Sequence, residues 1–333
     1  MIEFYGKCYD IKTARQLKKA APTGSVECWE SLIEILGYCG IGDRSFEQFQ
    51  RMLKQGCQPK AKTFAIVMNS CGINGYANEV GSLFSLMKSK YNITPSIPHY
   101  TSLIDALCRV NRLNTAQSYL QSLQNYAHKS SQTLPALLSI LKGCQKYNNY
   151  AQGMQIGEKI QQLKLSTPET QRILGNISLQ HGEQQKATRY YNEAFRLGKQ
   201  QKREVTWTSN NAEIFEFRSE DSSEESESLY KSNWKELDTL IQLGLQFQKH
   251  LDHFSEEDKK KFLLSHSECY ALRFAHEQQQ TNALRITKDT PISADVHAWL
   301  LGVSKLWKQE ILARDSVRLH HIKDGTCSCP YHW

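Results

Sequence analysis

The feature that most constrains this chain is an internal repeat of 35 to 36 residues, marked by aromatic residues at Trp29, Phe64 and Tyr100. Within each unit the apolar residues recur at the spacing of one helix face. A polar or Gly-containing turn, such as Asn74-Gly75, separates two such stretches. Two helices per unit at this period predict an α-solenoid, in which each unit buries its apolar face against the next.

The repeat divides the first part of the chain into two regions. Residues 1–131 form the regular repeats, with residues 1–25 as the remnant of an earlier unit. Residues 132–203 continue as helix pairs with less regular spacing. We interpret the repeated apolar positions as packing, because an apolar stripe along a helix usually faces a core.

The pattern changes at residue 204. Residues 204–217 place β-forming residues on both sides of Asn210-Asn211, which predicts a β-hairpin. The acidic run 219–228 predicts a flexible, solvated loop. Helical spacing then returns from Leu229 to His250. We therefore assign residues 204–250 to a hairpin and a linker helix.

The last part, residues 251–333, mixes strands and helix. Leu284–Thr287 and Glu310–Ala313 have the composition of short buried strands, and Ala298–Trp307 between them has that of a helix. Strand–helix–strand order is typical of an α/β sheet. The expected fold class is mostly α: an α-solenoid of helix-pair repeats followed by a small α/β domain.

Composition limits the kinds of partner and of cellular compartment that the chain can have. It has 41 Lys and Arg against 34 Asp and Glu, a net charge of +7, which allows a nucleic-acid partner. Of its 10 cysteines only Cys327 and Cys329 lie close together, which indicates a reducing compartment and one metal site rather than a disulfide scaffold. No apolar run approaches the ~18 residues of a membrane helix, so we expect no membrane partner.

Potential metal ligands gather near the C-terminus. His266-Ser267-Glu268 is followed by His297, by His320-His321 and by Cys327-Ser328-Cys329. Thiolate and imidazole are the usual ligands of zinc, and a Glu close to a ligand His can move protons at a metal-bound water. Nucleobase deaminases use this His and Glu pairing, with a Cys-x-x-Cys completing the metal site.

The stretch from His266 to Trp333 resembles the DYW domain of plant-type pentatricopeptide repeat (PPR) proteins, which perform C-to-U RNA editing in organelles. The shared segments are, in order, His266-Ser267-Glu268, Leu284-Arg285-Ile286, His297, Arg314-Asp315-Ser316, Arg318-Leu319-His320-His321, Lys323-Asp324-Gly325 and Cys327-Ser328-Cys329. Tyr331-His332-Trp333 stands where the family has Asp-Tyr-Trp. The resemblance implies a cytidine-deaminase-like fold for the α/β domain, and residues 132–203 resemble the family's E motifs.

By this resemblance the chain has one structural zinc site. Its ligands would be His297, His320, Cys327 and Cys329, and two Cys with two His are a closed tetrahedral set. The sequence leaves open whether His320 or His321 is the ligand, and we expect His320.

At the family's catalytic zinc site the chain departs from the pattern. The family has Cys-x-x-Cys-His where this chain has Ser293-Ala294-Asp295-Val296-His297, so two ligands are missing. His266 remains as a remnant catalytic zinc ligand and Glu268 as the catalytic residue. One His cannot hold a zinc ion, so we expect a degenerate deaminase centre. An active zinc-dependent cytidine deaminase on RNA is the alternative, with an unusual ligand replacing the Cys pair.

The repeats resemble PPR units, which read one RNA base each through a residue near the start of the first helix and the last residue of the unit. Here those pairs are Glu30 with Lys60, Ala65 with Ser96, and Thr101 with Ser131. The family's usual pairs place Asn, Ser or Thr first and Asp or Asn last, so none of the three matches fully. We expect single-stranded organellar RNA as a weakly bound or assisted partner. A non-enzymatic helical-repeat adaptor is the other interpretation.

The expected function is an accessory role in organellar RNA editing, together with other editing-factor proteins. The family's habit favours the mitochondrion over the plastid. The chain opens on residues 1–8, which resemble the middle of a helical repeat, so we expect that an N-terminal targeting segment is missing from this chain.

Overall fold

The computed structural model describes residues 1–7, 10–21, 25–126, 130–198, 205–210, 213–218, 224–246, 255–278 and 283–329. The chain forms two compact units, one within residues 1–201 and the other within residues 202–329. Among the described residues, no helix is both long and apolar enough to cross a membrane.

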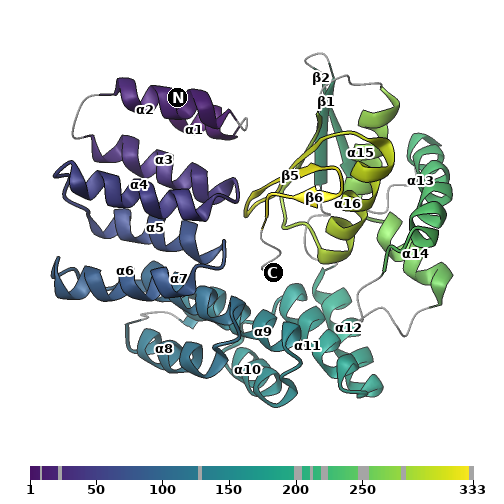
Figure 1. The fold of residues 1–333 in the computed structure, drawn as a ribbon. Coiled ribbons are helices and arrows are strands. Elements are labelled where there is room, and N and C mark those ends of the chain that lie inside the picture. The colour runs from purple at the N-terminus through teal and green to yellow at the C-terminus, as the bar shows by residue number, and fades with distance from the viewer. Residues whose placement is uncertain are drawn as a thin grey trace. The chain divides into compact units, whose positions relative to one another are not determined.

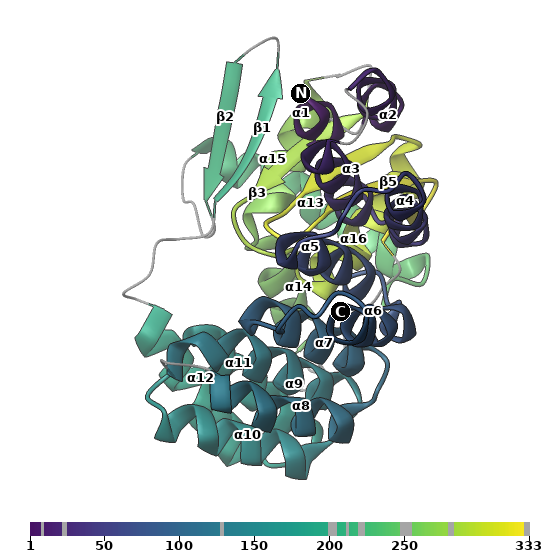
Figure 2. The ribbon, with the colours of Figure 1, turned by 90° about the vertical axis from the view of Figure 1, so that its left-hand side faces the viewer.

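The first unit is a stack of antiparallel helix pairs (Figures 1 and 2). Its elements are α1 (Ile2–Lys7), α2 (Ile11–Ala20), α3 (Val26–Tyr38), α4 (Gly42–Lys54), α5 (Ala61–Gly72), α6 (Ala77–Ser89), α7 (Ile97–Arg109), α8 (Leu113–Tyr126), the 3₁₀ turn η1 (Ser130–Thr133), α9 (Leu134–Lys146), α10 (Tyr150–Gln162), α11 (Pro168–Gln180) and α12 (Gln184–Gly198). The first helices of successive pairs, α3, α5, α7, α9 and α11, pack against one another in a row. The predicted α-solenoid is confirmed.

Each of these five pairs turns at a residue in the left-handed region of backbone conformation. The turn residues are Gly40, Gly75, Asn111, Asn148 and Gly182, with φ values of 79°, 83°, 62°, 55° and 83°. Glycine and asparagine adopt this conformation at the end of a helix with the least steric cost. These residues are 34 to 37 apart, so the period continues through 132–203, where the sequence predicted less regular spacing.

Neighbouring pairs share a core and are also joined by hydrogen bonds. The repeat-marking residues Trp29, Phe64 and Tyr100 are all buried in one continuous apolar cluster. Side chains of one unit donate to the unit before it: Asn74 Nδ2 to Gly37 O at 2.9 Å, Tyr147 Oη to Arg109 O at 2.5 Å, and Gln152 Nε2 to Gln117 Oε1 at 2.8 Å. The bonds to Gly37 and Arg109 satisfy carbonyl groups that the end of a helix leaves without an intrahelical partner.

The second unit is built on a six-stranded sheet. Its strands are β1 (Val205–Asn210), β2 (Glu213–Arg218), β3 (Leu284–Lys288), β4 (Ile311–Arg314), β5 (Leu319–Lys323) and β6 (Thr326–Cys327), in the order β2-β1-β3-β4-β5-β6. Its helices are α13 (Glu224–Gln242), α14 (Glu256–Leu264), α15 (Ser267–Glu277) and α16 (Ala294–Trp307). The parallel strands β3 and β4 are connected through α16, and the other neighbouring strands are antiparallel. The small α/β domain is therefore confirmed.

The observed elements differ from the expected ones in two ways that matter for the site. Helix α16 begins at Ala294 rather than at residue 298, because Ser293 caps it, and its first turn therefore includes Val296 and His297. The sequence did not predict β5 and β6, in which candidate metal ligands interrupt the apolar pattern. The hairpin belongs to the same sheet, since Thr206 of β1 pairs with Lys288 of β3.

The prediction of a flexible loop over the acidic run 219–228 is wrong for its second half. Residues 224–228 are the start of α13 rather than a loop, which is compatible with the good helix propensity of Glu. Residues 219–223 lie outside the described residues. The linker helix expected from Leu229 to His250 therefore runs from Glu224 to Gln242, and residues 247–250 also lie outside the described residues.

Two glycines give a direct test of the packing between units. A Cβ on Gly37 in α3 would lie 2.3 Å from Ser70 Cβ and 2.6 Å from Ser70 Cα in α5, whereas a Cβ on Gly81 in α6 would have no neighbour within 4 Å. We predict that Gly37→Ala lowers the free energy of unfolding by about 1–3 kcal/mol through overpacking. Gly81→Ala should raise it by up to about 1 kcal/mol through helix propensity. Chemical denaturation of both variants measures this, and equal effects would contradict it.

Candidate metal centre and nucleic-acid interface

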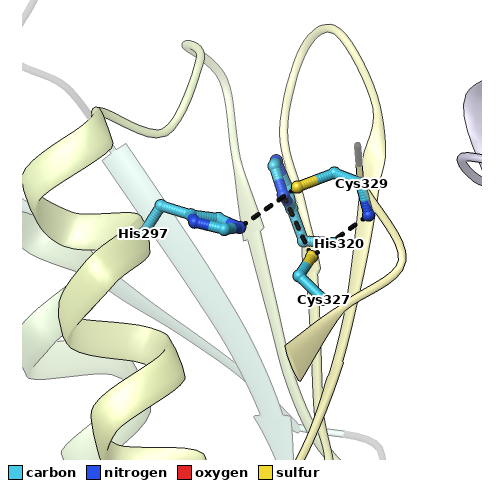
Figure 3. Close-up of side chains that lie close together, drawn as sticks. All are labelled: His297, His320, Cys327 and Cys329. Atoms are coloured by element: carbon cyan, nitrogen blue, oxygen red, sulfur yellow. Dashed lines mark hydrogen bonds between the residues drawn. The ribbon is translucent and has the colours of Figure 1, made fainter. Parts of the chain in front are cut away.

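Four potential metal ligands converge at one end of the sheet (Figure 3). They are His297 of α16, His320 of β5, Cys327 of β6 and Cys329, and their ligand atoms all lie within 4.8 Å of one another. His297 Nε2 lies 3.3 Å from Cys329 Sγ, and His320 Nδ1 lies 3.8 Å from Cys327 Sγ. The structure thus brings together the four residues that the sequence predicted for a structural zinc site.

The β5–β6 hairpin delivers three of these ligands. Asp324 and Gly325 both have positive φ, 50° and 77°, which is the backbone of the tightest hairpin turn. That turn pairs Ile322 with Cys327 and returns the chain toward His320. The Asp324-Gly325 turn therefore brings Cys327 and Cys329 back to the side of His320.

Strand alternation decides between the two neighbouring histidines. His320 is fully buried and is part of the cluster, whereas His321 is half-buried and its Nε2 bonds to Glu310 Oε1. Successive side chains of a strand point to opposite faces of the sheet, so both rings cannot reach the same ion. The geometry therefore favours His320.

The side chains of the cluster shift one another's pKa values. Contact with Cys327, and then with His297 and His320, outweighs burial and lowers the pKa of the Cys329 thiol, while the same contact and burial raise the pKa of Cys327. Burial alone would lower the pKa of His320, but hydrogen bonds to Asp315 and Cys329 raise it. Two thiols and two imidazoles in this arrangement fit a closed tetrahedral zinc site of structural type.

At the expected catalytic zinc site, His266, Ser293 and Val296 all have contacts within the protein. His266 caps the start of α15, and its Nδ1 donates to the carbonyl oxygens of Phe262 and Leu263 at 3.0 and 3.1 Å. Ser293 Oγ accepts a hydrogen bond from Val296 N at 3.3 Å and so acts as the N-cap of α16. The Val296 side chain is fully buried. At the two positions of the missing Cys pair, Ser293 therefore caps α16 and Val296 packs in the core.

The structure holds no replacement ligand set for a catalytic zinc ion in the residues that it describes. There, the only group of three or more His, Cys, Asp or Glu side chains arranged for a metal is the four-residue cluster. Cys269, which is close to Glu268 in sequence, donates its thiol to Leu263 O, and burial raises its pKa well above the ordinary value. A buried neutral thiol is a poor metal ligand.

Glu268 itself is part of a buried ion pair. Its Oε1 lies 2.6 Å from Lys288 Nζ, and the side chains of Lys288 and Glu268 are 2% and 0% exposed. Ser267 Oγ lies 2.8 Å from Thr206 Oγ1 and 3.4 Å from Glu268 Oε2. Sequence reasoning missed Lys288, since a single Lys in a strand gives no sign that it pairs with a Glu 20 residues earlier.

Comparisons with known proteins agree with this geometry. The model of the DYW family of nucleic acid deaminases matches residues 244–333, and the PPR repeat model matches residues 62–91 and 98–126. The chain is a plant-type PPR protein with a DYW domain. Its Tyr331-His332-Trp333 terminus lies outside the described residues.

The relatives of this PPR–DYW chain are longer proteins. A putative pentatricopeptide repeat-containing protein of Arabidopsis thaliana is 26% identical over 337 residues, which cover 100% of this chain and 54% of the relative. A second one from Arabidopsis thaliana is 28% identical over 345 residues, which cover 100% of this chain and 40% of the relative. The chain thus spans about half or less of the length of these relatives.

Two solved structures resemble parts of the chain at low sequence identity. The maize protein PPR10, in complex with an 18-nucleotide psaJ RNA element, matches with a TM-score of 0.48 and 15% identity over 59% of this chain and 30% of that chain. The PPR domain of Arabidopsis thaliana protein-only RNase P 1, in complex with tRNA, matches with a TM-score of 0.41 and 17% identity over 54% of this chain and 95% of that chain.

The base-reading positions predicted for the PPR units lie at the starts of the first helices. Lys60 and Ser96 are the N-cap residues of α5 and α7, and Ser131 lies in η1; all three are exposed. Ala65 and Thr101 are half-buried in α5 and α7. RNA contact by these five residues and by Glu30 stays a prediction.

Glu30 differs from the other reading positions because it is buried. Its Oε1 accepts a hydrogen bond from Thr63 Oγ1 at 2.6 Å, and its Oε2 lies 3.6 Å from Lys62 Nζ. The Thr63 hydroxyl in turn accepts from the backbone N–H of Lys60 at 3.0 Å. In this conformation Glu30 joins two units rather than offering its carboxylate to a base.

The ligand assignment gives a prediction for metal content. We expect His320→Ala and Cys329→Ser to lose bound zinc, because each removes one of four ligands of a closed site. His321→Ala should keep its zinc, since the ring points away from the cluster. Elemental analysis of purified proteins measures this, and zinc lost from His321→Ala but kept by His320→Ala would reverse the assignment.

The buried ion pair gives a second prediction. Lys288→Met should lower the free energy of unfolding by about 3–5 kcal/mol, because Glu268 is left buried without its partner, and Glu268→Gln/Lys288→Met should recover part of the loss. Lys261→Met is the control: it breaks an exposed pair with Glu257, with side chains 55% and 66% exposed, and should cost less than about 1 kcal/mol. Chemical denaturation is the measurement, and a double variant no more stable than Lys288→Met would rule out the pairing.

Proposed function

We propose that this PPR–DYW chain binds RNA in organellar C-to-U editing, with a degenerate deaminase centre and an accessory role in an editing complex. The observation that carries the proposal is the local role of Ser293 and Val296, which stand where the family has two zinc-binding cysteines. The hydroxyl of Ser293 caps α16 and the side chain of Val296 is part of the apolar core. A catalytic zinc ion needs three protein ligands, and only His266 offers one here.

The state of Glu268 supports the same proposal. In a nucleobase deaminase this residue acts as general acid and base beside the metal-bound water. Here its carboxylate pairs with Lys288 in a site that solvent does not reach. A proton shuttle has to exchange protons with water or substrate, so the pair favours a structural role for Glu268.

The division of charge supports single-stranded RNA as the partner. Residues 1–201 contain 24 Lys and Arg against 13 Asp and Glu, a net charge of +11, whereas residues 202–333 contain 17 against 21, a net charge of −4. Attraction of phosphates to basic side chains supplies most of the sequence-independent binding of nucleic acid. The basic repeats would bind RNA weakly, and other editing-factor proteins would add affinity and the active deaminase.

One observation favours a second function, that of a non-enzymatic helical adaptor. Glu30 is engaged with Thr63 and Lys62, so one of the three units has little capacity to read a base. An adaptor would use the repeats for protein contacts alone. The hypothesis of an active deaminase is favoured only by the retained His266 and Glu268.

The proposed location is a mitochondrion or a plastid, in keeping with RNA editing in organelles. One relative, 28% identical over 346 residues, carries a name that describes it as chloroplastic. The family's habit, rather than any residue of this chain, makes the mitochondrion our first choice.

Measurements of zinc content and of editing activity together test whether the deaminase centre is degenerate. We predict one zinc per chain in the wild type and in Glu268→Ala, and no uracil formed from a cytidine-containing RNA by either. Ser293→Cys/Val296→Cys should bind a second zinc, because it supplies the two thiolates that complete the metal site of nucleobase deaminases. Ser82→Cys/Ser118→Cys, which adds two thiols at exposed positions, should keep one. Uracil formed by the wild type but not by Glu268→Ala would establish the enzyme instead.

The same preparation separates an RNA-binding protein from an adaptor. If the basic repeats make about three phosphate contacts with single-stranded RNA, affinity should fall roughly 20-fold between 50 and 200 mM salt. RNA binding that is absent even at low salt would leave the adaptor as the function.

A further inference from the structure

Asp315, directly after β4, collects hydrogen bonds from several parts of the second unit. Its Oδ1 accepts from Val317 N and Arg318 N at 2.7 Å each. Its Oδ2 accepts from Ile292 N at 3.0 Å and lies 3.3 Å from His320 Nε2. The side chain is buried, so these partners replace water. Only a carboxylate presents two acceptor oxygens to four donors.

One of these partners is a ligand of the metal cluster. Because Asp315 Oδ2 is an acceptor, the hydrogen bond places a proton on His320 Nε2 and leaves Nδ1 as the metal-binding nitrogen. The same ring presents Nδ1 to Cys327 Sγ at 3.8 Å. A ligand His whose second nitrogen is held by a carboxylate has a fixed tautomer and ring orientation.

A second partner controls the start of the helix that carries the other imidazole. Ile292 precedes Ser293, the N-cap of α16. The backbone N–H of His297 donates to Ser293 O at 2.8 Å in the first turn of that helix. A carboxylate that fixes Ile292 therefore also limits where His297 can stand relative to His320.

We propose that Asp315 is the positioning residue of the zinc centre, holding the His320 ring for coordination through Nδ1 and fixing the turn that leads to His297. The inference rests on the zinc centre and not on deaminase activity. It also connects that centre to Ser293, so that zinc bound by the cluster would stabilise the start of α16. The sequence analysis assigned no role to Asp315, which was identified only as part of the shared segment Arg314-Asp315-Ser316.

The decisive variant is Asp315→Asn, which keeps the size of the side chain but turns one acceptor into a donor. Its control is Asp324→Asn, the same change at an exposed residue of the β5–β6 turn. Zinc affinity is measured by competition with a chelator. We expect Asp315→Asn to bind zinc about 10–100-fold more weakly than the wild type and Asp324→Asn to stay close to it. The visible spectrum of the Co²⁺-substituted protein should change in Asp315→Asn only.

A merely structural Asp315 would give a different result. The zinc-free variant would then be less stable than the zinc-free wild type, while zinc affinity and the Co²⁺ spectrum would be unchanged, and the proposal would be overturned. Should Asp315→Asn fail to fold, nitrogen-15 NMR of His320 in the zinc-loaded wild type decides. Metal on Nδ1 and a proton on Nε2 support the proposal, and metal on Nε2 excludes it. Neither readout depends on RNA editing, so the proposed function can fail separately.

Discussion

The second unit depends on one junction, where the first turn of α16 meets the β5–β6 hairpin. Two imidazoles and two thiols face each other there, and three of the four side chains are buried. An ion bound among them would tie the start of α16 to β5 and β6, which follow α16 and β4 in sequence. Asp315 supports the junction from the other side by holding both the strand and the approach to the helix.

The residues at the proposed degenerate centre also fit their local surroundings. Serine is among the best N-cap residues and valine packs well in a core, so both substitutions satisfy the local demands of the α16 start. The carboxylate of Glu268 finds its counter-charge in Lys288. Glu268 and Ser293 thus both have partners from the protein itself. These pairings are compatible with the degenerate deaminase centre that we propose.

Elements that depend on a pattern of neighbouring residues could be predicted from the sequence. Contacts between residues far apart in the chain could not. The helix pairs follow from a period that repeats itself, and the β1–β2 hairpin from β-formers around Asn210-Asn211. Strands β5 and β6 were not predicted, because histidine and cysteine interrupt the apolar pattern that indicates a strand. The ion pair of Lys288 and the contacts of Asp315 join residues that only the sheet brings together. The zinc ligands could be named in advance because a family resemblance, rather than spacing, supplied them.

The hydrogen bonds between repeats have a direction. Asn74, Tyr147 and Gln152 each donate to groups of the unit before them. During synthesis a unit leaves the ribosome before the unit that donates these hydrogen bonds to it has been made. The array can therefore assemble in the order in which it is translated, each new pair finishing its predecessor. Its last pair, α11 and α12, has no successor within the repeats, which makes that end the natural place for fraying to begin.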